Sequence, residues 1–168
     1  MNKKQLLCVL IVSCLVATLL AFKKKSAVKQ VEVVQIDWYR KLSTSTQDTL
    51  YVINFWATWC VPCVAELPNF EKLNRLNKHR KLKVILVSLD GLKSKDKVLI
   101  PFVNQRNIKS EVVLLNEPNF NAWIDLIDSS WSGALPATLF LNPAKKIHGF
   151  VEKELKFTEL DSLVNFYK

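Results

Sequence analysis

Residues 50–63 of the chain, LYVINFWATWCVPC, place two cysteines directly after a run of apolar residues. The first seven, Leu50–Trp56, have the length and composition of a strand that is buried on both faces of a sheet. After the cysteines, apolar residues recur at the three- and four-residue spacing of a helix, at Val64, Leu67, Phe70, Leu73 and Leu76. The sequence therefore predicts a central strand that ends just before Cys60 and a helix that begins there.

Cys60 is expected at the N-terminus of this helix, where unpaired backbone N–H groups and the helix dipole favour an anion. A thiolate is stabilised at such a position, so we expect the pKa of Cys60 to lie below the free value of about 8.5. Thiolates are the species that attack disulfides. Cys63 follows about one turn later and lies inside the helix. We therefore expect Cys60 to attack a substrate disulfide and the less exposed Cys63 to release the product.

Two other uses of a Cys-x-x-Cys pair fit the sequence less well. A structural zinc site needs four ligands, but the domain has no second cysteine pair, and its two histidines, His79 and His148, lack ligand spacing. No metal site is predicted. A structural disulfide across so short a loop would remove little entropy from the unfolded chain. Thiol–disulfide exchange is the use that the position of the pair favours.

Strands and helices alternate along the rest of the chain. We expect further strands at 31–36, 83–89, 112–115, 137–141 and 147–151, the last two forming a hairpin around Asn142-Pro143. Helices are expected at 38–42 and 158–166, with Asp37 and Thr158 as N-caps, and also at 95–107 and 119–127. The helix at 95–107 should turn Val98, Ile100, Phe102 and Val103 inward. This order predicts an α/β fold with a mixed central sheet flanked by helices.

The segment Trp59-Cys60-Val61-Pro62-Cys63 after a buried strand resembles the active site of the thioredoxin superfamily. Residues 31–168 most closely resemble the TlpA/ResA-like thiol–disulfide oxidoreductases of bacterial envelopes. Glu66 and Pro68 complete a Cys-x-x-Cys-x-x-Glu-x-Pro pattern typical of that group. Asn54 stands where cytoplasmic thioredoxins usually carry a buried acid. The resemblance implies a thioredoxin-like fold and an enzyme that needs no cofactor.

The resemblance also implies roles for individual residues. Leu135-Pro136 resembles the cis-proline loop of the family, which faces the cysteines and pairs its backbone with an extended substrate segment. Trp59, Val61 and Pro62 are expected to contact the same substrate, and Trp56 and Trp59 to be half core and half groove wall. Glu66 is expected near the cysteine pair, in proton transfer or specificity. The alternatives are an ordinary trans Pro136 and a surface carboxylate at Glu66.

Compared with the family, residues 116–134 are predicted to be a helical insert that precedes the proline loop. Its tryptophans, Trp123 and Trp131, are expected either to pack in the core or to shape a groove for a partner. The hairpin turn at 142–146 also departs from the family, because relatives more often have an acid and a glycine there. The chain has three glycines in total, so its turn type stays open.

The N-terminal part of the chain has a membrane signature. Residues 6–22 carry no charge, which is near the short end for a transmembrane helix. Six of the nine positive units of net charge lie in residues 1–30, which leaves +3 for residues 31–168 and no footprint for nucleic acid. We expect residues 1–22 to be an apolar helix acting as a membrane anchor, or a signal segment that is cleaved or lipidated at Cys14, followed by a linker at 23–30.

These features predict an enzyme of the cell envelope, on the periplasmic or outer side, that exchanges disulfides with protein substrates. We expect it to act as a reductase supplied by a membrane or envelope electron donor. The alternative is a redox-regulated module that binds or delivers a client, for example in cytochrome c maturation, with little turnover. Peroxidase chemistry is disfavoured, because Thr58 is not at the Thr-x-x-Cys spacing relative to Cys60.

Overall fold

The computed structural model describes residues 2, 28–77 and 81–168. The predicted anchor or signal segment at 1–22 lies outside the described residues apart from residue 2, and so do Cys14, His79 and most of the linker at 23–30. Among the described residues, no helix is both long and apolar enough to cross a bilayer. Lys29 is described, and its ammonium group donates to the carbonyl oxygens of Ile108 and Ser110.

A six-stranded mixed sheet forms the centre of the domain, in the order β1-β4-β3-β2-β5-β6. Its strands are β1 (Glu32–Val34), β2 (Leu50–Trp56), β3 (Leu82–Ser88), β4 (Glu111–Leu115), β5 (Ala137–Asn142) and β6 (Ile147–Val151). The first four are parallel to their neighbours, whereas β5 runs antiparallel to β2 and β6 antiparallel to β5. This arrangement confirms the predicted α/β fold with a mixed sheet and a terminal hairpin.

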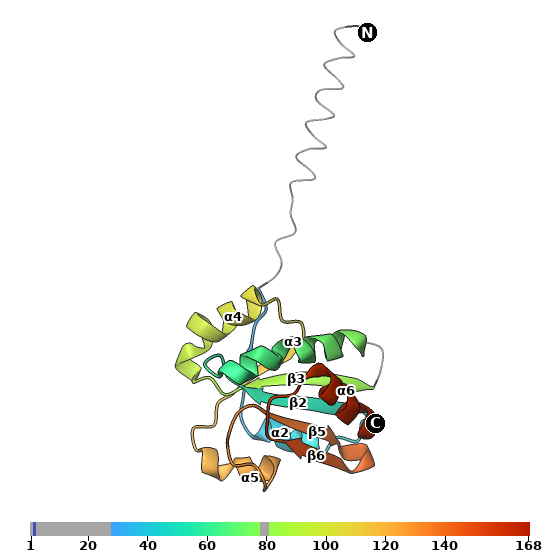
Figure 1. Ribbon diagram of the computed structural model, residues 1–168. Helices are drawn as coiled ribbons and strands as arrows, with labels where there is room; N and C mark the ends of the chain where they lie inside the picture. Colours follow the sequence, from blue (N-terminus) through green and yellow to red (C-terminus); the bar gives the residue numbers. More distant parts are fainter. Residues whose placement is uncertain (1, 3–27, 78–80) are drawn as a thin grey trace.

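Helices cover both faces of the sheet (Figure 1). On one face lie α3 (Val61–Leu76), α4 (Ile100–Gln105) and α6 (Phe157–Phe166), and on the other lie α2 (Asp37–Ser43) and α5 (Ile124–Ile127). Shorter turns are the 3₁₀ segments Leu92–Ser94, Phe120–Ala122 and Pro143–Lys145 and the π-helical turn Lys95–Leu99. The helix expected at 119–127 is therefore two short pieces.

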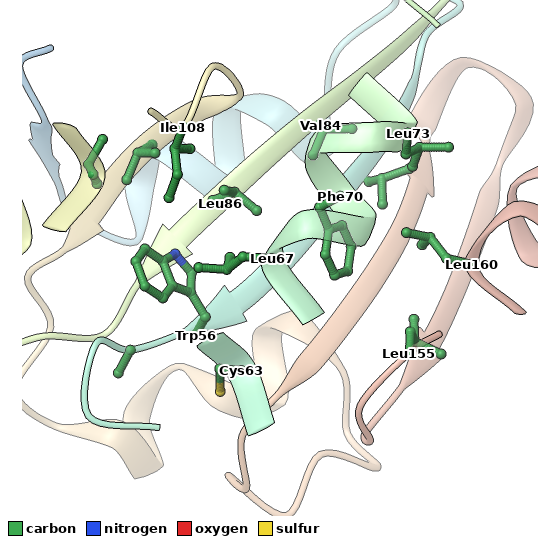
Figure 2. Close-up of a cluster of buried hydrophobic side chains, with 14 of the residues drawn as sticks. Trp56, Cys63, Leu67, Phe70, Leu73, Val84, Leu86, Ile108, Leu155 and Leu160 are labelled. Atoms are coloured by element: carbon green, nitrogen blue, oxygen red, sulfur yellow. The ribbon is translucent and has the colours of Figure 1, made fainter. Parts of the chain in front are cut away.

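The central strand β2 serves two separate cores, because alternate residues of a strand point to opposite faces. Val52 and Trp56 join the core under α3, α4 and α6, while Ile53 and Phe55 join the core under α2 and α5. All seven residues of β2 are buried, as the continuous apolar run predicts. Figure 2 shows the first core, with Trp56 and Cys63 beside the end of β2 and Leu67 pointing toward Trp56.

The two predicted N-caps are wrong by one or two residues. Asp37 is the first residue of α2, and its carboxylate accepts from Arg40 at 2.7 Å instead of capping a backbone N–H group. In α6, Lys156 stands at the N-cap position without a side-chain bond, and Thr158 lies within the first turn. In both cases a residue with capping chemistry lies inside the helix, where its side chain no longer faces the free N–H groups.

The inward face of the helix predicted at 95–107 is also partly wrong. Val98 is 45% exposed, whereas its neighbour Leu99 is fully buried. The cause is the π-helical turn over Lys95–Leu99, whose i→i+5 hydrogen bonds widen the turn and shift the buried face by one residue. Beyond this turn, Val103 is buried as expected. In α3, Leu76 is exposed at the last residue, where the predicted apolar stripe has left the core.

The aromatic insert packs into the second core. Trp123 and Trp131 are both buried, and their rings lie 6.5 Å and 4.7 Å from that of Phe55 on β2. Of the two expectations for these tryptophans, core packing is therefore confirmed. The hairpin turn is a 3₁₀ turn that ends at Lys146, a non-glycine residue in the left-handed region with φ of 57°.

Candidate active site

Cys60 and Cys63 form a disulfide at the N-terminus of α3, with their Cα atoms 5.3 Å apart. Cys60 is the N-cap residue of the helix, and its Sγ accepts from the backbone N–H of Cys63 at 3.3 Å. Cys60 is 6% exposed and Cys63 is fully buried. The prediction that Cys63 is the less accessible sulfur is confirmed. The helix N-terminus therefore directs its free N–H groups toward the sulfur that solvent reaches first.

The loop before Cys60 is held by a carboxylate that sequence reasoning missed. Asp90 follows β3, and it accepts from the backbone N–H of Thr58 at 3.1 Å and from the Thr58 hydroxyl at 2.6 Å. It also accepts from the Ser88 hydroxyl at 2.7 Å. Because β2 and β3 are parallel, their carboxyl ends meet at the same edge of the sheet. Asp90 thereby fixes the residues that deliver Cys60 to the helix.

The surface around the disulfide is apolar and open. Trp59 is 68% exposed and Val61 is 81% exposed, and Pro62 is exposed beside them. Trp56, in contrast, is fully buried, so the prediction that it forms half of a groove wall is wrong. The strand carries Trp56 into the core, where its ring lies 5.5 Å from that of Phe102. Large side chains exposed next to a buried disulfide are a typical feature of a docking surface.

The predicted proline loop lies next to the end of β2. The Leu135–Pro136 peptide bond is cis, as the resemblance implied. Ala137 pairs with Phe55 in the antiparallel register of β2 and β5, so Pro136 falls opposite the last residue of β2, Trp56. The cysteines follow β2 by a few residues. The topology thus brings Leu135 and Pro136 to the edge of the sheet from which Cys60 emerges.

A second carboxylate holds the approach to this proline loop. Glu152, just after β6, accepts from the N–H and hydroxyl groups of Ser132 and from the N–H of Ala134, the last at 2.9 Å. The indole N–H of Trp131 donates to the carbonyl of Ala134 at 2.9 Å. Two side chains therefore fix the backbone immediately before Leu135. The sequence offers no local signal for Glu152, because its partners lie 18 to 20 residues away.

Glu66 is fully buried on α3, one turn after Cys63, so the surface carboxylate considered for this position is wrong. One carboxylate oxygen accepts from the amide of Asn54 and the other from the backbone N–H of Leu155, each at 2.7 Å. Burial raises the pKa of Glu66 to about 7, against the opposing effect of these two hydrogen bonds, and the nearby charge of Glu154 adds to the increase. Residues three apart share one helix face, so Glu66 and Cys63 point the same way.

Asn54 connects Glu66 to the proline strand. Besides Glu66, its amide nitrogen lies 3.2 Å from the Thr138 hydroxyl and 3.5 Å from the Ala137 carbonyl. Its own oxygen is buried without a hydrogen-bond partner in the described part of the chain. Asn54, Glu66 and Thr138 thus form a buried polar group where β2, α3 and β5 meet. Within residues 28–77 and 81–168 there is no cluster of three or more His, Cys, Asp or Glu side chains suited to a metal ion.

A Cys-x-x-Cys disulfide at a helix N-terminus, beside a cis-proline at the start of an antiparallel strand, defines a thioredoxin-like protein. Solved structures agree with this class at the level of fold. A thioredoxin-related protein from Neisseria meningitidis serogroup B superposes with a TM-score of 0.63 at 21% identity, covering 72% of this chain and 86% of that one. StoA from Bacillus subtilis superposes with a TM-score of 0.54 at 20% identity, covering 70% and 84%.

The sequence comparison is consistent with the fold. Residues 24–149 match the model of the AhpC/TSA family, and the chain belongs to that family. Its curated relatives include the thiol-disulfide oxidoreductase ResA of Oceanobacillus iheyensis, 30% identical over 68% of this chain and 55% of the relative. The sporulation thiol-disulfide oxidoreductase A of Bacillus subtilis is 24% identical over 56% and 57%. The predicted TlpA/ResA-like resemblance is thereby confirmed, although the chain spans only about half the length of these relatives.

Proposed function

We propose that this chain is a thiol–disulfide oxidoreductase that reduces disulfides of client proteins in the cell envelope. The observation that carries the proposal is the Cys60–Cys63 disulfide at the N-terminus of α3. Its more accessible sulfur, that of Cys60, lies between the exposed residues Trp59 and Val61. The named activity of the ResA relatives supports the same chemistry.

The reaction begins with the pair reduced. The Cys60 thiolate attacks one sulfur of the client disulfide, so that a Cys60–client bond forms and the other client sulfur leaves as a thiolate. The Cys63 thiolate then attacks Cys60 Sγ, which releases the second client sulfur. The client gains two electrons, and Cys60 and Cys63 end as the disulfide found in the structure. An envelope dithiol donor must reduce this disulfide before the next cycle.

Glu66 is proposed to take the proton from the Cys63 thiol. Cys63 is fully buried and must lose its proton before it attacks. A pKa of about 7 leaves the Glu66 carboxyl close to half ionised at neutral pH, so it is able to accept a proton and release it again. Asn54 and the Leu155 backbone hold the carboxylate in place.

The client is proposed to bind as an extended segment along the proline loop. The backbone of Leu135 would pair with this segment while cis-Pro136 excludes a competing N–H donor. Trp59, Val61 and Pro62 would contact client side chains on either side of the disulfide. The position of Leu135–Pro136 at the same sheet edge as Cys60 supports this arrangement.

An envelope location is proposed from the apolar stretch at 6–22, with its flanking lysines, and from the likeness in fold to a secreted disulfide oxidoreductase of Mycobacterium tuberculosis. Residues 1–22 would act as an anchor or as a signal segment, with residues 31–168 outside the cytoplasm. Fractionation of cells that carry the full chain, followed by protease accessibility of Trp59 and its neighbours in intact spheroplasts, tests the location. Protection of the domain until lysis would contradict it.

The activity is tested by reduction of insulin disulfides with the full-length protein and a small dithiol as donor. Cys60→Ser removes the attacking sulfur, so turnover should fall to the uncatalysed rate. Cys63→Ser should instead accumulate a covalent adduct between Cys60 and the client, because the release step is lost. Cys8→Ser is the matched control and should retain activity. Wild-type turnover in Cys60→Ser, or a client that binds Cys63→Ser without a covalent bond, would contradict the proposal.

A further inference from the structure

A groove of about 430 Å³ lies between α3 and the segment that leads from α4 into β4. Its base includes Leu67 and Ile108, both buried in the first core, and Figure 2 shows these two side chains on the same side of the sheet as Trp56. No residue of the proposed disulfide-exchange machinery lines this groove. The volume lies within the range of about 300–1,000 Å³ that is typical of ligand-binding clefts.

One end of the groove lies next to the disulfide. Val64, which lines it, directly follows Cys63, and its backbone N–H donates to the carbonyl of Cys60. Further lining residues on α3 recur every three or four positions as far as Arg75. The eleven helical steps from Val64 to Arg75 extend about 17 Å. The groove is therefore a channel along α3 that starts at the exchange site.

Three cationic side chains line the groove. Arg75 lies in the last turn of α3, Arg106 is the C-cap of α4, and Lys109 follows shortly after; all three are exposed and line the groove. No ion pair joins them to a carboxylate within residues 28–77 and 81–168, which contain every Asp and Glu of the chain. Because α3 begins at the exchange site, Arg75 in its last turn lies at the opposite end of the groove, while Arg106 and Lys109 line the other wall.

Glu71 is the only carboxylate among the residues that line the groove, and it already accepts hydrogen bonds from the backbone. Its two oxygens accept from the N–H groups of Lys109 and Ser110 at 2.7 Å and 2.9 Å. It thus holds the opposite wall of the groove in place while neutralising one of three positive charges. An apolar base with a surplus of cations along its walls is complementary to an amphipathic anion.

We propose that this groove binds an acidic segment of the same client protein whose disulfide meets Cys60. A large apolar client side chain would cover Leu67 and Ile108, and client carboxylates would pair with Arg75, Arg106 and Lys109. This inference rests on the proposed function, because only an exchange client is brought to this edge of the domain. An extended chain rises about 3.3 Å per residue, so the acidic residues would lie about five positions from the client cysteine.

A protein segment fits the groove better than a lipid surface. A membrane contact uses apolar side chains that protrude from the domain and enter the bilayer. Here the apolar residues Leu67 and Ile108 are recessed between two walls. A narrow channel with a buried base accommodates a single chain, which makes an acidic peptide the occupant that its shape and charge favour.

The test compares two disulfide-bonded peptides that differ only near the fifth position from the cysteine. One carries glutamates around a leucine there, and the other carries glutamines around the same leucine. The pre-reduced full-length protein should react with the acidic peptide about tenfold faster at low ionic strength, and high salt should remove most of the difference. A serine analogue of each peptide, which cannot exchange, measures binding alone by fluorescence anisotropy.

Arg75→Glu/Arg106→Glu should abolish or reverse the preference in both assays and leave the rate with the glutamine peptide unchanged. Arg75→Gln/Arg106→Gln provides a milder variant if the first is poorly folded. Lys41→Glu/Lys168→Glu is the matched control, since it makes the same charge change at exposed positions that do not line the groove. This control should keep the preference for the acidic peptide.

Equal rates for the two peptides with the parent protein would overturn the groove proposal and leave the exchange activity intact. A preference that survives in Arg75→Gln/Arg106→Gln would also overturn it. Binding of anionic vesicles that is lost in the same variant, without any peptide preference, would assign the cations to lipid instead. Failure to react with either peptide would contradict the proposed function itself, so the two failures are distinguishable.

Discussion

Glu66 and Glu152 both accept hydrogen bonds from nearby donors, but their pKa values are shifted in opposite directions. Glu66 accepts two bonds and is fully buried on α3, three residues after Cys63, and burial raises its pKa to about 7. Glu152 accepts three bonds near the surface beside the proline loop. Burial works against its ionisation as well, but the bonds from Ser132 and Ala134 together outweigh it and hold the pKa of Glu152 below its usual value.

The number of hydrogen-bond donors therefore does not decide whether the pKa of a carboxylate in this domain is raised or lowered. The extent of burial decides it, because the desolvation of Glu66 disfavours the charged form by more than its two hydrogen bonds favour it. The two residues are consequently suited to different tasks. Glu152 stays charged and fixes a loop, whereas Glu66 is able to change its charge near neutral pH, as a proton acceptor must.

The largest expected effect is on the pH dependence of stability in Glu66→Gln. A carboxyl with a raised folded-state pKa binds more protons when folded than when unfolded between pH 4.5 and about 7, so the parent loses stability as pH rises through this window. The loss amounts to about 3 kcal/mol, and glutamine does not undergo it. Urea denaturation of the oxidised protein at pH 5 and pH 8 measures the difference.

The variant should therefore gain stability relative to the parent as pH increases. Glu32→Gln, at an exposed carboxylate on β1, is the control and should follow the parent at both pH values. Parallel pH profiles for Glu66→Gln and the parent would mean that the carboxyl is ionised throughout. That result would also remove Glu66 from the proposed proton transfer.

Asp90 combines features of both carboxylates. It is buried, like Glu66, and it accepts hydrogen bonds from several donors, like Glu152. Asp90→Asn replaces one accepting oxygen by a donor that faces Thr58, so a buried N–H or hydroxyl group loses its partner. We expect a loss of about 2 kcal/mol in the free energy of unfolding. Asp125→Asn, at an exposed position, should change stability by less than about 0.5 kcal/mol. Chemical denaturation that finds the two variants equal would show that the Asp90 bonds contribute nothing.

Glu152→Gln should have the smallest effect on stability, below about 1 kcal/mol, because its bonds are near the surface. Its effect should appear in client binding instead. A looser proline loop should raise KM for insulin about threefold with kcat unchanged, and should not alter the rate with a small aromatic disulfide. An equal effect on both substrates would show that Glu152 does not act through the loop.

The pH dependence of Glu152 has the opposite sign to that of Glu66. Its lowered pKa means that its bonds stabilise the fold above the unfolded-state value and are lost as pH falls through the folded-state value. The KM difference between Glu152→Gln and the parent should therefore shrink as pH falls through the lowered folded-state pKa of Glu152. Steady-state kinetics across this range, with the parent as reference, measures it.

Local patterns were enough to predict the parts of the fold that depend on neighbouring residues. The apolar runs of β2 and β3 and the position of Cys60 at a helix start follow from composition and spacing alone. The misplaced inward face at 95–107 comes from a π-helical turn, which helical periodicity does not represent. The N-caps predicted at Asp37 and Thr158 are wrong because the actual N-cap positions lie one residue earlier in α2 and two residues earlier in α6.

The candidate site was predictable only where a motif identifies it. Cys60, Cys63, Glu66 and Pro136 belong to a pattern of residue types, whereas Asp90 and Glu152 act on backbone groups 32 and 18 to 20 residues away. No spacing rule links such pairs, because the sheet brings them together. The groove along α3 was missed for the same reason, since its two walls come from separate crossovers.

The hydrogen bond from Leu155 to Glu66 has a consequence for the order in which the chain assembles. The two residues are 89 positions apart, and Leu155 lies beyond all six strands. Until that part of the polypeptide has emerged, one oxygen of the Glu66 carboxylate has no native donor. Closing so long a loop is slow compared with forming local structure. In a newly made chain, the thiols of Cys60 and Cys63 are therefore present before the Glu66–Leu155 contact can form. During this interval the thiols are free to form disulfides with other cysteines.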